Sequence, residues 1–480
     1  MANFSYGLLY IDKDNYEPYI LSEIRNNLMF SETDYFTNQL KSYKYFYEDD
    51  RYLLIPKYYN SVHKFPFIHY NEYVTEGSDI NIEMIKCTEP RDPEQQKAID
   101  FILNNNAGII KAYTGFGKTW CAIKAICNYK KKTLIIVNKK KLLNQWVDEF
   151  VEFTNLTKDD IGIISGRASI KKALKKPIII SVINTLGSIG NDGLYPETND
   201  YLKEFIDANI GLTILDEVHK TSVTPYFSKG GLFFVSKKIF GLSATPKKSN
   251  KKLTDILKMY FNNNMFIPDE SNRLKPKIVV VIYDSKIPMK SWNYIKYGGK
   301  FIASRYRKLL LKSDVYNKMI LKLITTLNSY EKTRGILYVA HEIDFLKIMK
   351  DKFEESTNEE VGLVIGNSDE SETKKRIINS TYQMITDGLS IKHLNKLIQG
   401  TPISSDTSVE QLAGRITRDH TDKEAQPEIF DLVDVNNSRF IHQFKQRLET
   451  YTQLGYEISA CIRYDDQQDK FVLDDLSKYL

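Results

Sequence analysis

The stretch 112–119, AYTGFGKT, has the spacing of a phosphate-binding loop: a small residue, four further residues, and then Gly-Lys-Thr. It lies between an apolar run and a run of good helix formers that begins at Trp120. In such a loop, backbone N–H groups and the positive end of the following helix surround phosphates, so we expect Thr114, Gly115 and Gly117 to line a nucleotide. The alternative interpretation is a glycine turn that begins a buried helix.

The end of this loop and a later carboxylate pair could supply the chemistry of hydrolysis. Lys118 is expected to reach the β- and γ-phosphates of ATP, and the Thr119 hydroxyl to ligate Mg²⁺. In LTILDEVHK an apolar strand ends in Asp216 and Glu217, followed by His219. We expect Asp216 to share the metal with Thr119, because neighbouring parallel strands end at one sheet edge, and Glu217 to hold the attacking water. His219 is expected to sense the γ-phosphate or the partner domain.

Two later segments complete the candidate chemistry. Ser243-Ala244-Thr245 ends another predicted strand, and its hydroxyls are expected to hydrogen-bond the carboxylate–histidine cluster and relay its state to the nucleic-acid side. In VEQLAGRITR, Arg415 and Arg418 fall on one helix face, three residues apart, with Gln411 on the preceding turn. Arginines of this kind stabilise the charge that spreads over the phosphoryl oxygens during hydrolysis. The alternative is the basic face of an amphipathic helix.

Read in order, these segments resemble the superfamily-two DExH helicases. The resemblance covers residues 89–450 and rests on QQKA (from Gln95), AYTGFGKT, NKKKLLNQW, INTLG, DEVH, SAT, ITDGLSI and QLAGRITR. It implies that Gln95 contacts adenine and that Gly388 contacts both the nucleic-acid strand and the nucleotide. Ser390 stands where many relatives have an aspartate, which puts the contact of this residue with the ATP ribose in doubt. The residues that it places on nucleic acid are Lys139, Lys140, Gln145, Trp146, Thr185 and Thr245.

Within that superfamily the chain looks most like phage UvsW-type branch-migration and recombination helicases, which are relatives of XPB-like translocases. The DEVH sequence, the compact length and the segment FDLVDVNNSRFIHQFKQRLETYTQLGYEI carry this finer resemblance. It implies an ATP- and Mg²⁺-dependent motor on single-stranded, forked or junction DNA. Replication or recombination proteins are candidate partners, and the implied setting is a phage or virus protein in the host cytoplasm.

The elements that must position these residues form an α/β pattern. Short β-branched runs alternate with helical stretches twice along the chain, which predicts two tandem RecA-like parallel-sheet domains. We expect an N-terminal α+β accessory domain at 1–88, a first helicase domain at 89–283, a linker at 284–312 and a second helicase domain at 313–480. The accessory domain, rich in Tyr and Phe, is expected either to hold DNA or to be a small packed sheet. The last residues, 465–480, are read as a short helix or a loose tail.

Composition excludes several classes of protein. The 480 residues are 42% hydrophobic and 27% charged, which is ordinary for a globular protein, and no apolar run is long enough to span a bilayer. We therefore expect a cytoplasmic protein with no membrane partner. Cys87, Cys121, Cys127 and Cys461 show no CxxC pair and are read as reduced core thiols. The net charge is only +6, but lysine clusters recur between residues 130 and 252, which favours a phosphate-backbone track over solvated loops.

Three alternatives remain open on the sequence alone. An RNA helicase would share the motor and would be stimulated by RNA at least as well as by DNA. A transcript-release factor would share it too, but would need an RNA polymerase. A non-hydrolysing, ATP-gated nucleic-acid clamp belongs to another class, and the presence of Glu217 with Arg415 and Arg418 argues against it, because a clamp needs no turnover machinery.

Overall fold

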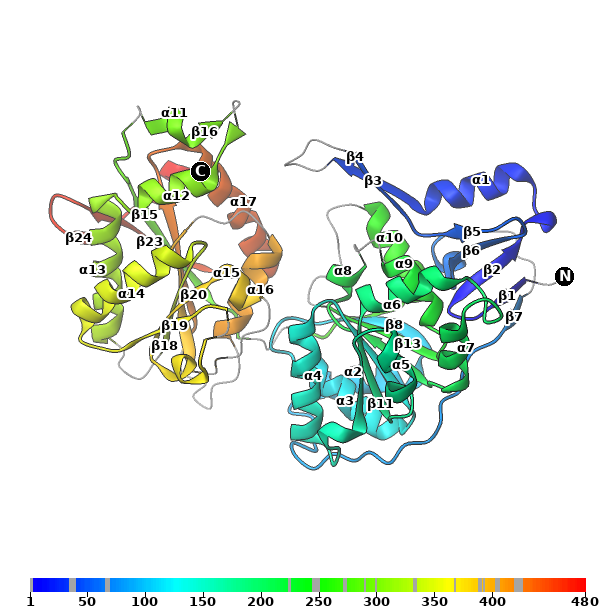
Figure 1. The fold of residues 1–480 in the computed structure, drawn as a ribbon. Helices are drawn as coiled ribbons and strands as arrows, with labels where there is room; N and C mark the ends of the chain where they lie inside the picture. Colours follow the sequence, from blue (N-terminus) through cyan, green and yellow to red (C-terminus); the bar gives the residue numbers. More distant parts are fainter. Residues whose placement is uncertain are drawn as a thin grey trace. The chain divides into compact units, whose positions relative to one another are not determined.

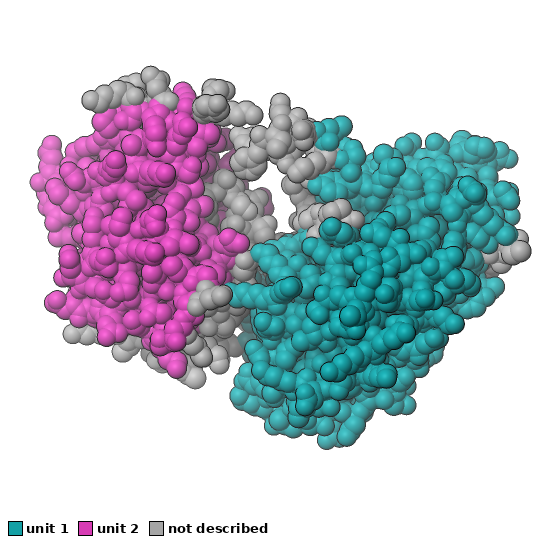
Figure 2. Space-filling model, viewed as in Figure 1, with its two compact units in different colours: residues 1–270 teal, residues 271–480 magenta. Residues whose placement is uncertain are grey.

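A computed structural model gives the fold. It describes residues 3–33, 40–64, 70–222, 226–243, 251–270, 274–288, 291–297, 300–330, 335–366, 368–386, 391, 393–401, 406–417 and 426–480. The chain divides into two compact units, residues 1–270 and residues 271–480, which Figure 2 shows in two colours. Among the described helices, none has both the length and the apolar character that crossing a bilayer requires.

The first unit is built on a seven-stranded sheet in which every strand pair is parallel (Figure 1). Its buried, β-branched strands match the apolar runs of the sequence. In spatial order they are β10 (Ile161–Ile164), β11 (Ile178–Val182), β9 (Thr133–Val137), β12 (Leu212–Leu215), β13 (Lys238–Ser243), β8 (Ala107–Lys111) and β14 (Met265–Phe266).

Helices cover both faces of this sheet, because successive side chains of each strand point to opposite faces. Thus Ile110 and Ile135 join one core with α2, α3 and α4, whereas Ile109 and Ile136 join another with α6, α7, α9 and α10. The helices of the first unit are α1 (Pro18–Asn27), α2 (Pro93–Asn104), α3 (Lys118–Tyr129), α4 (Lys140–Phe153), α5 (Ile170–Ala173), α6 (Ile183–Ile189), α7 (Asp200–Asp207), α8 (Val218–Thr221), α9 (Phe227–Gly230) and α10 (Lys251–Tyr260).

The N-terminal region is a small α+β layer, as expected. A mostly antiparallel sheet carries α1, and a separate hairpin projects from it. The strands of the sheet, in spatial order, are β5 (Tyr47–Glu48), β6 (Tyr52–Pro56), β2 (Leu8–Asp12), β1 (Asn3–Ser5) and β7 (Tyr70–Glu72); the hairpin strands are β3 (Met29–Thr33) and β4 (Leu40–Lys44).

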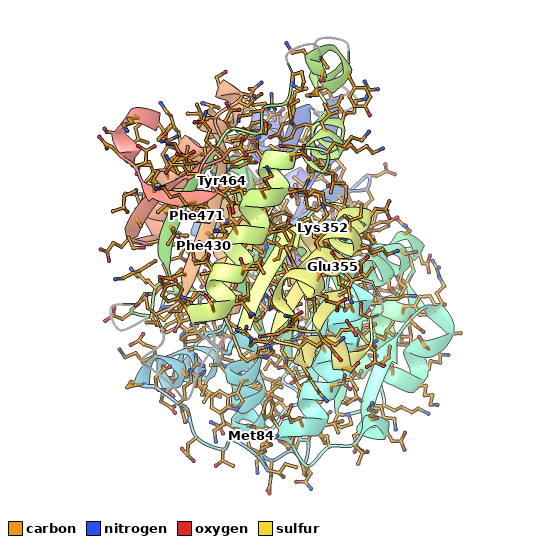
Figure 3. All side chains as sticks on the ribbon, turned by 90° about the vertical axis from the view of Figure 1, so that its left-hand side faces the viewer. Met84, Lys352, Glu355, Phe430, Tyr464 and Phe471 are labelled. Atoms are coloured by element: carbon orange, nitrogen blue, oxygen red, sulfur yellow. The ribbon has the colours of Figure 1, made fainter. Side chains whose placement is uncertain are left out.

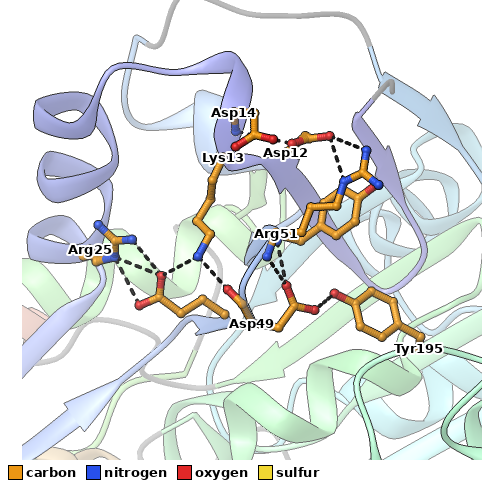
Figure 4. Close-up of polar contacts among 9 residues, drawn as sticks. Asp12, Lys13, Asp14, Arg25, Asp49, Arg51 and Tyr195 are labelled. Carbon is orange, nitrogen blue, oxygen red and sulfur yellow. Dashed lines mark hydrogen bonds and ion pairs between the residues drawn. The ribbon is translucent and has the colours of Figure 1, made fainter.

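This N-terminal layer is part of the first compact unit, and the prediction of a separate domain at 1–88 is corrected accordingly. Its apolar side chains share one core with α6, α7, α9 and α10. A Cβ on Gly7 would lie 2.2 Å from the Gly231 carbonyl oxygen, so the two backbones touch. Polar contacts add to the apolar ones: Asp49 accepts a hydrogen bond from the Tyr195 hydroxyl, and Lys13 donates to the Asp49 carbonyl (Figure 4).

The second unit is built on an eight-stranded sheet that is parallel except for its last strand pair. Its strands, in spatial order, are β19 (Val361–Val364), β20 (Ile377–Thr381), β18 (Gly335–Ala340), β21 (Leu394–Gln399), β22 (Glu428–Asp434), β15 (Lys277–Tyr283), β23 (Ile458–Asp465) and β24 (Lys470–Leu473). Two parallel α/β sheets with an N-terminal α+β layer confirm the predicted fold class.

Helices cover both faces of the second sheet as well. One core holds α12, α13 and α14, and the other holds α15, α16 and α17. Phe430, Tyr464 and Phe471 pack in the first of these cores, on the side shown in Figure 3. The remaining elements are α11 (Trp292–Ile295), β16 (Lys296–Tyr297), β17 (Lys300–Phe301), α12 (Ala303–Leu310), α13 (Asp314–Tyr330), α14 (Ile343–Thr357), α15 (Tyr382–Thr386), α16 (Asp406–Ile416) and α17 (Ser438–Leu454).

Three predictions about the chain's organisation are wrong. The predicted first domain includes the segment 277–283, but β15 lies in the second sheet, between β22 and β23. The predicted linker 284–312 contains α12, whose Tyr306 and Leu310 are core residues of the second unit. The C-terminal residues are not a loose tail: β23 and β24 form an antiparallel pair at the edge of the sheet, and the short helix expected there is confined to a 3₁₀ helix at Leu476–Tyr479.

The cysteines were predicted as reduced core thiols. All four are free of disulfides, and Cys121, Cys127 and Cys461 are buried. Cys87 is exposed, so the prediction is wrong for this residue; it lies in the extended segment that precedes α2 rather than on a packed element.

Candidate functional site

The loop between β8 and α3 has the backbone of a phosphate-binding loop. Gly115 and Gly117 have φ values of +93° and +89°, a region that residues with a Cβ rarely adopt. Gly117 is the N-cap of α3 and supplies no side chain to cap the helix. The first N–H groups of α3, a helix of twelve residues, are therefore not capped by the side chain of the N-cap residue. They lie at the positive end of the helix dipole, an arrangement that suits a bound phosphate.

Lys118 begins α3, and its ammonium group is held over the loop. Its Nζ donates to the carbonyl oxygens of Ala112, at 2.7 Å, and of Tyr113, at 3.0 Å. Thr119 follows on the first turn of the helix and is half-buried. A phosphate oxygen is a stronger acceptor for an ammonium group than a peptide carbonyl, so this lysine fits the predicted contact with a nucleotide.

A residue of α2 hydrogen-bonds to the loop. Asp92 caps this helix by accepting from the Gln95 N–H, at 2.9 Å. The buried Gln95 side chain donates from Nε2 to the Phe116 carbonyl, at 2.7 Å, and accepts at Oε1 from the Arg91 N–H, at 3.0 Å. Gln95 therefore braces the phosphate loop, in addition to the adenine contact that the resemblance implies.

Arg91 is a residue of this site that the sequence reading missed. Its guanidinium group donates to the carbonyl oxygens of Gly115, at 2.9 Å, and Phe116, at 3.1 Å. The only signal in the sequence is its place just before the cap of α2, and an exposed arginine there is more often a solvated residue.

Asp216 follows β12 and is 9% exposed. Its Oδ2 accepts from the Trp146 indole Nε1–H at 2.9 Å, and its Oδ1 accepts from the Glu217 N–H at 2.8 Å. Burial, together with the neighbouring Glu217 carboxylate, raises the pKa of Asp216 to about 6, and the Lys118 charge acts in the opposite direction. A buried carboxylate with a raised pKa, beside a phosphate loop, fits a ligand of a divalent cation.

Glu217 is the N-cap of α8 and has the left-handed φ of +46°. For a non-glycine residue this conformation costs about 1 kcal/mol or more, and such residues cluster at functional sites. His219 Nδ1 lies 3.2 Å from Glu217 Oε2 and 2.6 Å from Ser243 Oγ. The predicted hydrogen bond between the last residue of β13 and the carboxylate–histidine cluster is therefore confirmed for Ser243.

The strands that lead to Thr119 and Asp216 are not neighbours, which corrects the expectation from the sequence. In the sheet, β13 lies between β8 and β12. The phosphate loop and the DEVH residues still meet at one edge, because all three strands are parallel and end there. Ser243, at the end of the intervening strand, accordingly contacts His219.

The predicted nucleic-acid residues separate into two groups. Lys139 and Lys140, at the start of α4, are exposed, and Gln145 and Thr185 are half-buried on α4 and α6. Trp146 is 1% exposed and packs in the core, so the prediction that it touches nucleic acid is wrong. Thr245 lies outside the described residues.

The predicted lysine track is also corrected. Lys139–Lys141 follow β9 at the carboxyl edge of the sheet, whereas Lys130–Lys132 precede β9 at the opposite edge. Lys131 pairs with Asp79 at 2.8 Å, and Lys132 Nζ donates to two backbone carbonyl oxygens at 2.7 and 3.1 Å. These two clusters therefore lie at opposite edges of the sheet and do not form one continuous surface.

The remaining predicted residues belong to the second unit. Arg415 lies near the end of α16 and is only 5% exposed. Gly388, Ser390 and Arg418 lie outside the described residues, as does the side chain of Gln411.

Comparison with known proteins finds helicases among the sequences similar to this chain. Residues 88–248 match the family described as type III restriction enzyme, res subunit. A putative ATP-dependent RNA helicase of Acanthamoeba polyphaga mimivirus, L396, is 26% identical over 98% of this chain and 89% of its own. These matches, like the motifs, make the chain similar to superfamily-two helicases. It is an ATP-hydrolysing helicase.

More distant matches extend the comparison. The DNA 3′-5′ helicase XPB of Kineococcus radiotolerans is 28% identical over 35% of this helicase and 28% of its own chain. Among solved structures, yeast Dbp5 bound to RNA and ADP BeF3 matches 78% of this chain and 91% of its own, with 11% identity and a TM-score of 0.51. T4 UvsW aligns over 96% of this chain and 99% of its own, with 19% identity and a TM-score of 0.38.

Proposed function

We propose that this helicase is an ATP- and Mg²⁺-dependent DNA translocase that remodels branched or forked duplex DNA. The proposal of ATP-driven translocation rests on one observation. The phosphate loop lies at the same edge of the first sheet as Asp216, Glu217, His219 and Ser243. The choice of DNA is supported by the motif resemblance to UvsW-type and XPB-like proteins and by the similarity to a DNA helicase XPB.

In this proposal each residue of the ATP site has a definite task. The N–H groups of the loop and Lys118 bind the phosphates, and the Thr119 hydroxyl and Asp216 hold Mg²⁺. The ion would neutralise charge on the phosphoryl oxygens when it is bound. Glu217 orients the attacking water, and His219 with Ser243 fixes the Glu217 carboxylate.

The second unit is proposed to contribute Arg415 and Arg418, with Gln411 and Gly388, to nucleotide contact and turnover. Arginine side chains stabilise the charge that builds up on a transferring phosphoryl group. Lys139, Lys140, Gln145 and Thr185 are proposed to bind the phosphate backbone of the nucleic acid, since exposed cations next to a helix start attract it.

An RNA helicase is the second candidate, and a specific observation favours it. The viral relative that matches 98% of this chain carries the description of a putative ATP-dependent RNA helicase. The ATP-hydrolysing machinery would be the same, so the two candidates differ only in whether the nucleic acid is DNA or RNA.

The deciding experiment is an ATPase assay on the full chain with single-stranded DNA, duplex, forked DNA, a four-way junction and RNA as separate stimulants. Forked or junction DNA is expected to give the largest stimulation. Equal or greater stimulation by RNA would favour the RNA helicase, and stimulation only with an RNA polymerase would favour a transcript-release factor. Nucleotide binding without turnover above background would favour the clamp.

A further inference from the structure

The Trp146 indole joins two regions that the proposed function treats separately. Trp146 lies in the middle of α4, with its ring in the core beside Phe150 and its Nε1–H on Asp216 Oδ2 at 2.9 Å. Because the Glu217 N–H holds the other oxygen at 2.8 Å, both oxygens of the Asp216 carboxylate have a donor that fixes the orientation of the group.

The same helix begins at the predicted nucleic-acid contact. Lys139 is the N-cap of α4 and Lys140 its first residue, and both are exposed at the carboxyl edge of the sheet. Trp146 follows Lys140 by less than two turns, or about 9 Å of helix axis. Leu143, Val147 and Phe150 pack on the same core as the indole, so a shift of the first turn is transmitted along a rigid helix.

We propose that Trp146 is a positioning residue that couples nucleic acid bound at the start of α4 to the Asp216 carboxylate, and thereby stimulates ATP hydrolysis. The inference rests on the proposed function. Phosphates drawn to Lys139 and Lys140 displace the first turn of α4, and the indole N–H moves with it. The carboxylate follows its donor, which changes how Asp216 presents its oxygens to a bound divalent cation.

If the Trp146 indole has only a structural role, a different result is expected. An indole N–H that needs only a buried acceptor would stabilise the fold, and its loss would lower the melting temperature without a selective effect on stimulated turnover. Loss of a coupling residue would instead affect stimulated turnover selectively. DNA would still bind, but it would no longer increase ATP hydrolysis.

The first test compares Trp146→Phe with a matched control, Trp120→Phe. Both changes keep an aromatic ring and remove one indole N–H; the Trp120 indole, on the adjacent α3, donates to the Cys87 carbonyl at 3.1 Å. We expect Trp146→Phe to lower DNA-stimulated kcat at least tenfold while the Kd for forked DNA stays within threefold. Trp120→Phe is expected to keep wild-type stimulation. Full stimulation of Trp146→Phe would overturn the inference.

A second measurement retains Trp146 and does not depend on the folding of that variant. The chain has three tryptophans, so the double variant W120F/W292F leaves Trp146 as its single indole fluorophore. Forked DNA added without nucleotide is expected to shift its emission, and Mg²⁺ with ADP to shift it again. Lys140→Ala in the same background should weaken the first shift.

The outcomes of these tests are distinct. Bound DNA with unchanged Trp146 emission would overturn the coupling and leave the proposed function intact. Wild-type protein that no nucleic acid stimulates would instead overturn the proposed function, and the coupling with it.

Discussion

Buried carboxylates occur in both parallel sheets, with different partners. In the first sheet Asp216 takes its hydrogen bonds from an indole and a backbone N–H, both neutral donors. In the second sheet Asp431, on β22, receives two hydrogen bonds from the Arg447 guanidinium, at 2.9 and 2.8 Å, and one from the Tyr451 hydroxyl, at 3.0 Å. Arg447 and Asp431 are 3% and 1% exposed, so this pair is shielded from water.

We infer from this difference that the Asp216 carboxylate is available to a ligand, whereas the Asp431 carboxylate stabilises the fold. Asp431 is neutralised within the unit, and its removal would leave a buried arginine without its counter-charge. Asp216 has a raised pKa because burial and Glu217 disfavour its charge, which a cation bound beside it would offset. We therefore expect changes at the edge of the first sheet to affect turnover more than stability, and the reverse for the Asp431 pair.

Lys118→Ala should have the largest effect. Removing the ammonium group deprives the β- and γ-phosphates of their main cation in the first unit, so ATP hydrolysis should fall at least a thousandfold. A steady-state ATPase assay measures this, with the melting temperature as the control for folding. A variant that keeps wild-type turnover would show that the phosphate loop is not the site of hydrolysis.

Arg415→Ala should follow. We expect turnover to fall on the order of a thousandfold, while the Kd for ATP rises only a few-fold, because the arginine acts on charge that develops in the transition state. Single-turnover hydrolysis and equilibrium nucleotide binding separate the two effects. If the variant instead loses its folded second unit, Arg415 is a structural residue like Arg447.

Asp431→Ala should affect stability rather than chemistry. Breaking a buried pair by removing one partner costs about 3–5 kcal/mol, which denaturant unfolding of the second unit would detect. Glu359→Ala is the matched control: Glu359 also pairs with an arginine, Arg376, at 2.8 Å, but its side chain is 31% exposed. The control should cost about 1 kcal/mol or less. Equal losses in both variants would remove the distinction between the two kinds of charge.

Ser243→Ala should have the smallest effect. It removes the hydroxyl beside His219 Nδ1 but leaves Glu217 in place, and one hydrogen bond is worth about 0.5–1.5 kcal/mol. Stimulated ATP hydrolysis should therefore fall by at most about tenfold. A loss of a hundredfold or more would mean that Ser243 takes part in the chemistry itself.

The sequence predicts the strands and the backbone of the phosphate loop well because both are local patterns. The runs at 133–137, 178–182 and 428–434 are strands, as expected from their β-branched residues. The glycines of the phosphate loop were identified by spacing, and they have the backbone conformation that this spacing requires. Local chemistry of this kind is set by residues close together in the chain.

Long-range pairing could not be read in the same way. The strand at 277–283 pairs with strands that begin at Glu428 and Ile458, far along the chain, and prolines on either side of it resemble a linker. The role of Trp146 was misread because the motif gives its place on the helix but not the face that it occupies. Arg91 was missed because its acceptors are backbone carbonyls, which have no signature in the sequence.

The most direct test of the ATP site is Glu217→Gln in the full chain, with ATP binding and hydrolysis measured side by side on forked DNA. The amide keeps the size of the side chain but cannot accept a proton from water, so we expect ATP and DNA binding near wild-type levels and hydrolysis reduced at least a thousandfold. Hydrolysis at the wild-type rate would show that Glu217 does not activate the attacking water.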